Sequence, residues 1–167
     1  MIEYKFGEFD SAEEINKTAE GLKAEGDKES LKALADENGL DMEAEDIEDY
    51  MAGAFQKFCT PLQAALGKLD IEKKDLAPEG IMVDWVGYVE LLVGDSEDFA
   101  KNVKRKGKSL RGCIAALLKY SFEHQWKVPD DIVKTAGVNA GRVTLGEPAM
   151  FEAKNIIRDY YRIGGAD

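Results

Sequence analysis

Residues 78–94 read PEGIMVDWVGYVELLVG, and this stretch predicts the central helix of the fold. Pro78 marks its start, because proline is accepted at the beginning of a helix, and Gly94 marks its end. The apolar residues between them recur with the period of a helix and form one wide face: Ile81, Met82, Trp85, Val86, Val89, Leu92 and Val93. A helix with so wide an apolar face is expected in the core of the protein.

Start and stop signals on both sides of this stretch predict further short helices. Ser11-Ala12-Glu13-Glu14 has the form of a capping box and predicts a helix over residues 11–25. Thr60-Pro61-Leu62-Gln63 predicts another, and Ser109 precedes the most regular apolar stripe of the chain, a helix expected to be buried along one side. That stripe consists of Leu110, Cys113, Ile114, Leu117, Leu118, Ser121 and Phe122. Shorter helices are predicted after residues 26–27, after residue 41, after residues 95–96, and within 128–137 and 148–163.

Strand signals are confined to two short segments. IEYKF at residues 2–6 and GRVTL at 141–145 have strand character, so a small two-stranded β element is the most we expect. The length of 167 residues suits one domain. The sequence therefore predicts a mainly α fold, a single domain over residues 1–167 built as a bundle of seven to nine short helices.

Charge is divided unevenly along the chain. Residues 1–100 hold 26 Asp and Glu against 9 Lys and Arg, whereas residues 101–167 hold 7 against 13, and the whole chain has a net charge of -11. An acidic part and a basic part of this size predict an electrically polarised molecule.

The densest acidic stretch lies at residues 34–55, LADENGLDMEAEDIEDYMAGAF. It holds eight carboxylates and no Lys or Arg between residues 36 and 49. A calcium-binding EF-hand loop needs oxygen ligands at its first, third and fifth positions and Glu at its twelfth. Counted from Asp36, the fifth position is Leu40 and the twelfth is Ile47, so the stretch does not fit such a loop.

A helix that begins at Asp41 explains the acidic stretch in another way. Its apolar stripe would be Ile47, Tyr50, Met51, Ala54, Phe55 and Phe58, and the carboxylates opposite the stripe would face solvent. These carboxylates belong to Glu45, Asp46, Glu48 and Asp49. Such an acidic face either keeps the protein soluble or binds the basic groove of a nucleic-acid-binding partner by displacing the counterions that phosphates displace. Both interpretations stay open.

A basic run follows at residues 101–111, with six cations within eleven residues: Lys101, Lys104, Arg105, Lys106, Lys108 and Arg111. We identify Lys104, Arg105, Lys106, Lys108 and Arg111 as a candidate surface for RNA, DNA or an acidic protein. The alternatives are a solvated face or an internal counterweight to the acidic part of the chain.

The sequence offers little equipment for catalysis. His124 is the single histidine, with no Ser, Cys or carboxylate at a diagnostic spacing. Cys59 and Cys113 lie among apolar residues at helical spacing, where a free cysteine behaves as a small hydrophobe. The two cysteines lack the paired spacing of a zinc site, and the sequence contains no cluster of metal ligands. We therefore expect a protein that is not an enzyme and has no metal or cofactor.

Two segments resemble nucleotide- or DNA-binding motifs only in part. Gly107-Lys108-Ser109 looks like the end of a phosphate-binding loop, but the glycine required five residues earlier is Asn102. Residues 130–144, DDIVKTAGVNAGRVT, resemble the turn of a helix-turn-helix, although the second helix would contain Gly141 and end near Pro148. Nucleotide binding is excluded, and the helix-turn-helix remains a minor alternative.

The chain has no apolar run long enough to cross a bilayer, and its first residues, MIEYKFGEFDSAEE, lack the features of a signal peptide. We expect a cytoplasmic protein that does not bind membranes.

Six segments together resemble a known family of small acidic proteins. They read AEGLKAEGD, LADENGLD, TPLQAALGKLD, IMVDWVGYV, RKGKSLRGCIAALLKYSFE and LGEPAMFEAKNIIRDYY. The chain is similar over nearly its whole length to the PcfK-like proteins of bacterial mobile elements, a family that includes Cas9 inhibitors, the anti-CRISPR proteins. GKSLRGC at residues 107–113 is the most recognisable piece.

The resemblance implies a non-enzymatic inhibitor in the bacterial host cell. Its expected partner is a type II Cas9 effector, alone or with its guide RNA, and it would block the binding or cleavage of target DNA. Such effectors hold nucleic acid in basic channels, so the acidic face could act as a mimic of DNA. Free DNA is not an expected partner, and a homodimer stays open. The alternative is a nucleic-acid-binding accessory or regulatory protein of a conjugative mobile element, which would use the basic run.

Overall fold

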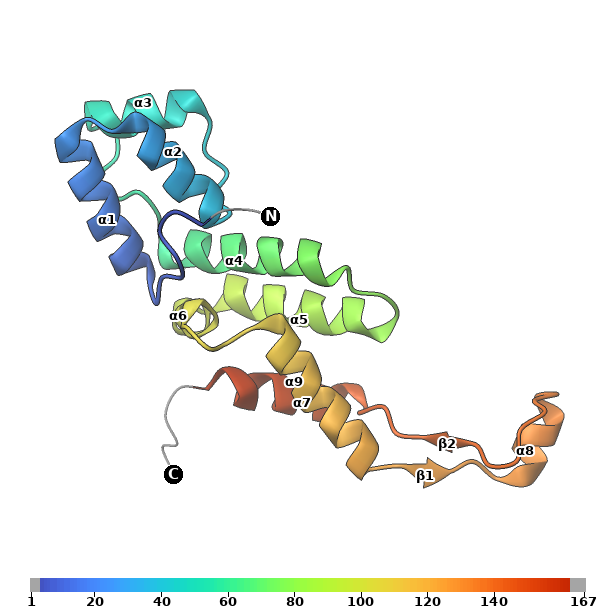
Figure 1. The fold of residues 1–167 in the computed structure, drawn as a ribbon. Coiled ribbons are helices and arrows are strands. Elements are labelled where there is room, and N and C mark those ends of the chain that lie inside the picture. The colour runs from blue at the N-terminus through green and yellow to red at the C-terminus, as the bar shows by residue number, and fades with distance from the viewer. Residues whose placement is uncertain (1–3, 163–167) are drawn as a thin grey trace.

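The computed structural model describes residues 4–162, and it confirms the mainly α prediction. Figure 1 shows an elongated arrangement with α1–α3 at one end and a β1–α8–β2 projection at the other. The nine helices of the described residues are α1 (Ala12–Glu25), α2 (Lys28–Glu37), α3 (Ala44–Ala52), α4 (Pro61–Leu76), α5 (Ile81–Asp95), α6 (Glu97–Lys104), α7 (Leu110–Glu123), α8 (Asp130–Thr135) and α9 (Met150–Tyr161). The two strands, β1 (Trp126–Lys127) and β2 (Thr144–Leu145), pair antiparallel.

Side-chain caps fix the helix starts where the sequence predicts them. In each case an oxygen accepts a backbone N–H three residues later, which satisfies one of the free donors of a helix N-terminus. The capping residues are Ser11, Asp27, Thr60, Ser96 and Ser109. The central helix is confirmed as well, but it begins at Ile81 and not at the predicted Pro78.

The acidic helix is shorter than predicted. It ends at Ala52 because Gly53 adopts a left-handed conformation, with a φ of 82°, and closes the helix. Phe55 and Phe58 therefore follow the helix and are not part of its stripe. Phe58 is still buried, and its ring packs edge-on against Tyr50 at 5.0 Å.

The strand prediction is correct at one segment and wrong at the other. Residues 144–145 of GRVTL form β2, and Trp126 lies opposite Leu145 in the ladder. Of IEYKF, residues 2 and 3 lie outside the described part of the chain, and residues 4–6 form no strand. The Glu37 carboxylate instead accepts the backbone N–H groups of Lys5 and Phe6, at 2.5 and 3.0 Å, and holds this segment against α2.

Two hydrophobic cores lie side by side, and α4 contributes to both. Ala64 belongs to the first core, which α1, α2 and α3 surround, whereas Ala65 and Leu69 belong to the second, which α5, α6, α7 and α9 complete. Gly67 of α4 and Gly39, which follows α2, bring the cores close together. A Cβ atom on Gly67 of α4 would overlap the carbonyl oxygen of Asn38 at the end of α2, so only glycine permits this approach.

The chain leaves the second core after α7 and returns at α9. We call residues 124–149 the arm (Figure 1). The α7 stripe is only half as buried as predicted, because Leu110, Cys113 and Leu117 are buried while Leu118 and Phe122, next to the arm, are exposed. No helix within residues 4–162 is long and apolar enough to span a membrane.

Candidate functional site

Three of the four predicted acidic-face residues present their carboxylates to solvent. Glu45, Glu48 and Asp49 are exposed on α3. Asp46 is half-buried because it has a structural role: one of its carboxylate oxygens accepts the backbone N–H of Glu43 at 2.7 Å and closes the capping box of the helix. The outward acidic face therefore consists of Glu45, Glu48 and Asp49.

Few cations neutralise this face. Glu48 pairs with Lys28 of α2 at 2.7 Å, and both side chains are more than half exposed, where water weakens such a pair. Glu45 and Asp49 form no ion pair within the described part of the chain. The surrounding sequence adds to the negative potential, since residues 1–60 hold 17 Asp and Glu against 6 Lys and Arg.

A groove lies next to α3, between the α2–α3 connection and α4. Its two adjoining hollows have volumes of about 350 and 340 Å³ and share Asp41, Met42, Phe58 and Gln63. Apolar side chains, among them Leu40 and Leu66, line the groove together with charged residues: Asp41, Asp46, Lys57, Asp70 and Glu90. Sequence reasoning missed this groove because its walls are brought together by contacts between segments that are distant in the chain.

The basic run is turned inward only in part, and most of its cations are engaged within the molecule. Lys104 is buried, with 5% of its surface exposed, and Lys108 donates to the backbone carbonyl of Tyr160 at 2.6 Å. Arg105 pairs with Asp10 at 3.5 Å, and Arg111 with Asp75 at 3.0 Å. Lys101 pairs with Glu97 of its own helix. The run therefore acts mostly as the internal counterweight to the acidic part.

The side chain of Lys106 is the least engaged member of the run. Lys106 is exposed, and its contact with Asp10 is made by its backbone N–H, at 3.0 Å. The exposed cations of the run are Lys106, Lys101, which is paired with Glu97, and two paired arginines. They are far less than the continuous cationic surface that binding to a phosphate backbone requires.

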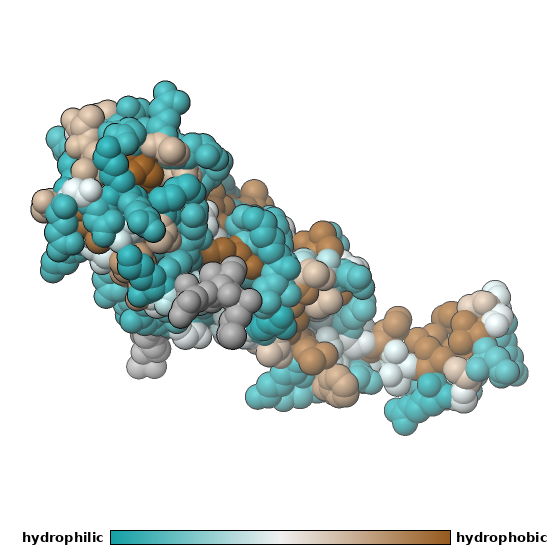
Figure 2. Space-filling view, turned by 45° about the horizontal axis from the view of Figure 1, so that its top comes forward, coloured by the Kyte–Doolittle hydropathy of each residue, from teal (hydrophilic) through white to brown (hydrophobic). Residues whose placement is uncertain are grey.

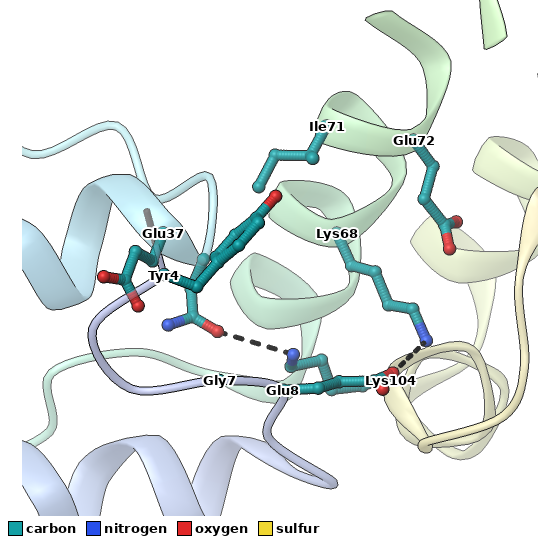
Figure 3. A pocket seen from close by; sticks show the side chains of 9 residues that line it. Tyr4, Gly7, Glu8, Glu37, Lys68, Ile71, Glu72 and Lys104 are labelled. Atoms are coloured by element: carbon teal, nitrogen blue, oxygen red, sulfur yellow. Dashed lines mark hydrogen bonds and ion pairs between the residues drawn. The ribbon is translucent and has the colours of Figure 1, made fainter. Parts of the chain in front are cut away.

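Lys104 and its neighbour Lys68 extend from α6 and α4 into one pocket of about 300 Å³ (Figure 3). Lys68 donates to the carbonyl oxygens of Arg105 and Lys108, at 2.9 and 2.7 Å, and lies 3.8 Å from the carboxylate of Glu8. Among the described residues, Lys104 reaches only the side-chain oxygen of Asn38, at 3.5 Å. Lys68 thus fixes the loop between α6 and α7.

Burial dominates the electrostatics of this pocket. It lowers the pKa of Lys68 and the pKa of Lys104, whose ammonium groups also repel each other, and it raises the pKa of Glu72. Three carboxylates, from Glu8, Glu37 and Glu72, line the pocket beside the two lysines. Because cations and anions are mixed here, the pocket has no excess positive charge for an anionic ligand.

The histidine and the two cysteines, which could take part in catalysis, do not line this pocket. His124 is exposed at the C-terminus of α7, where its ring stacks on Tyr120 at 4.0 Å. Both cysteines are buried, and burial raises the pKa of Cys59 to about 11 and that of Cys113 to about 12, which keeps the thiols protonated and unreactive. Within residues 4–162 no group of three or more His, Cys, Asp or Glu is arranged to hold a metal ion.

The helix-turn-helix interpretation is wrong. α8 ends at Thr135, and the residues that would form a recognition helix run without helical structure into β2 at Thr144. Gly137 turns the chain there with a φ of 69°, and the following residues are exposed. The segment therefore offers no helix that could enter a DNA groove.

Comparisons with protein-family models, with curated proteins and with solved structures give no match for this chain. The resemblance to the PcfK-like family accordingly stays a prediction from the sequence.

Proposed function

We propose that this protein is a non-enzymatic inhibitor that binds the basic nucleic-acid channel of an effector protein through the exposed carboxylates of α3. The observation that carries the proposal is the contrast between Glu45 and Asp49, which form no ion pair in the described chain, and the basic run, most of whose charges are engaged internally. The resemblance to PcfK-like proteins selects a Cas9-type effector as the partner.

Counterion release gives this binding its physical basis. A basic channel concentrates anions around its Lys and Arg side chains, and a rigid row of carboxylates displaces those anions as a phosphate backbone does. Helix α3 supplies such a row, since Glu48 and Asp49 lie three and four residues after Glu45, on the same side of the helix. The adjoining groove, with its apolar lining and the carboxylate of Asp41, can accept the stem and charged head of a long basic side chain from the partner.

The proposal is tested by DNA cleavage with purified Cas9 and its guide, together with gel shifts of the effector on target DNA. We expect cleavage and DNA binding to fall together as the protein is added, because the protein and the DNA would compete for one channel. Lost cleavage with intact DNA binding would mean that activation is blocked and would contradict competition. Unchanged cleavage with several Cas9 orthologues would overturn the Cas9 assignment.

A charge-reversal variant sharpens the test. Glu45→Lys, Glu48→Lys and Asp49→Lys together are expected to abolish inhibition, while Asp46 is kept because it caps the helix. The matched control reverses three exposed carboxylates near or on α5, Glu79→Lys, Asp84→Lys and Asp95→Lys, with the same change in net charge. Circular dichroism shows whether both variants fold. Equal inhibition by the two variants would rule out a specific role for α3.

The alternative of a nucleic-acid-binding accessory protein has its own test. Binding to bare DNA or RNA that weakens steeply with salt is its signature. We expect no such binding even at low salt, because the net charge of -11 repels nucleic acid and the basic run is engaged. Salt-sensitive binding that Lys106→Ala weakens would favour the accessory role instead.

A further inference from the structure

A long segment around the arm has no core of its own. From Leu118 to Glu147 no residue is buried, and α8 contributes no buried side chain. The ladder between β1 and β2 holds two residue pairs. An isolated two-stranded hairpin is marginally stable in water, because its few contacts hardly offset the entropy lost on ordering the chain. The arm therefore needs cover from another surface to be stably ordered.

The side chains that lack cover are large and apolar. Eight of them are at least half exposed on the arm and on the helix ends beside it, with Phe122 at 73% and Phe151 at 74%. The set, which we call the apolar patch, consists of Leu118, Phe122, Trp126, Ile132, Val138, Leu145, Met150 and Phe151. Figure 2 shows hydrophobic residues gathered along the arm, with hydrophilic ones at its edge and tip.

The size of the apolar patch matches one side of a stable protein interface. At roughly 100 Å² for each half-exposed large side chain, the eight residues expose on the order of 800 Å², the area that each partner buries in an interface of standard size. Folded monomers rarely expose this much apolar surface in one region.

The charge of this region favours a second copy of the chain as the partner. Residues 118–151 hold four Asp and Glu and four Lys and Arg, so two copies of this region meet without net repulsion. Residues 4–117 hold 25 Asp and Glu against 15 Lys and Arg, so two bodies would repel each other. The arm projects from the end of the molecule opposite α1–α3 (Figure 1), which keeps the acidic ends apart when two arms pack together.

We propose that the apolar patch is a dimerisation surface, on which two copies of the chain pack arm against arm around a twofold axis. Each arm covers the apolar side chains of the other, as a self-complementary interface requires. The two acidic ends then point outward, away from the interface and free to bind. This inference does not depend on the identity of the effector.

Sedimentation equilibrium of the full chain tests the dimer, without any effector present. We expect a mass of twice the 18.5 kDa of the chain, decreasing on dilution. Phe122→Asp combined with Trp126→Asp should weaken dimerisation by at least about 30-fold, since aromatic side chains at the centre of an interface contribute most to its free energy. The matched control is Val83→Asp with Leu91→Asp, two apolar residues of α5 with about half of their surface exposed, and it should dimerise as the wild type does.

Hydrogen exchange adds a readout that locates the interface. Amides of β1 and β2 should exchange slowly at concentrations where the dimer forms and faster on dilution or in the Phe122/Trp126 variant, while amides of α5 stay protected throughout. A monomeric mass at every concentration would overturn the proposal. A dimer that the control variant disrupts and the Phe122/Trp126 variant leaves intact would overturn it equally.

Discussion

Helix α3 and the basic run at residues 101–111 are equally dense in charge, but the structure uses them in opposite ways. On α3, Glu45 and Asp49 stand in solvent without an ion-pair partner in the described chain. In the basic run, Lys104 is buried and Lys108 donates to a backbone carbonyl. A dense run of charge in a sequence therefore does not by itself indicate an outward surface.

The chemistry of the side chains explains the difference. On α3 the short side chain of Asp46 reaches only the start of its own helix, which it caps. A lysine has a long apolar stem and three donors, so it can pack along a core and still donate to carbonyls at a chain turn. Lys68 and Lys108 both do this, and they hold the α6–α7 loop and α9 in place. The inward cations thus join helices, whereas the outward anions remain free for a partner.

The largest effect is expected from Gly67→Ala, which tests whether backbone packing rather than charge holds the acidic end to the rest of the molecule. The new methyl group would overlap the Asn38 carbonyl, so α2 and α4 must separate. We expect a loss of about 3 kcal/mol or more in the free energy of unfolding, measured by urea denaturation.

Gly21→Ala is the matched control for this change. Gly21 lies in α1 with no atom near the position of its missing Cβ, so alanine should stabilise the helix by up to about 1 kcal/mol. Equal effects of the two substitutions would show that the close approach of α2 and α4 is not tight.

A smaller loss is expected from Lys68→Met, which tests whether the inward lysines join the helices. Methionine keeps the apolar stem but removes the donor to two carbonyl oxygens, and hydrogen bonds from charged groups contribute about 1.5–3 kcal/mol. The control, Lys74→Met, changes an exposed lysine on the same helix and should alter unfolding by less than about 0.5 kcal/mol. A loss at Lys68 no greater than at Lys74 would contradict a joining role.

The sequence predicts the helices well because their signals are local. Ser96 and Thr60 cap the helices that they are predicted to cap, and the apolar face of residues 81–93 does lie in the core. The errors have a physical cause as well. The apolar spacing predicts a helix that begins at Asp41 and continues to Phe58, whereas the helix begins at Ala44 and Gly53 ends it. Spacing shows which residues share a face, but not where the backbone stops.

The candidate site was less predictable because it depends on contacts between distant segments. The contacts that engage residues 101–111 within the molecule come from Asp10, Glu72 and Tyr160, which lie more than 30 residues away in the sequence. The exposure of Phe122 contradicts a periodic stripe whose first half, with Leu117, is buried as expected. Helical periodicity does not show how much of the apolar stripe is covered by other parts of the molecule.

A third prediction concerns the pH dependence of the buried charge at Lys104. Burial lowers its pKa below the 10.5 of an exposed lysine, so the folded protein loses this proton before the unfolded chain does. The destabilisation by Lys104 is therefore complete below its folded-state pKa and is relieved as the pH rises through that pKa towards 10.5.

Lys104→Met removes that destabilisation, and Lys68 remains as the main counter-charge of Glu72. The variant should be about 1 kcal/mol more stable than the wild type at neutral pH, and its advantage should shrink as the pH rises. Urea denaturation at several pH values measures this, and Lys106→Met is the exposed control. A variant that is clearly less stable than the wild type would mean that the ammonium group of Lys104 supports the fold.

The smallest effect is expected at Arg111, whose pair with Asp75 is exposed on both sides. Water and salt screen such a pair, so Arg111→Ala and Asp75→Ala should each change the free energy of unfolding by less than about 0.5 kcal/mol. A double-mutant cycle gives the coupling between the two side chains, which we expect to be near zero at high salt. A coupling energy as large as the loss at Lys68 would mean that the exposed Arg111 holds segments of the chain together as the buried lysines do. Burial would then not separate the cations that join helices from those that do not.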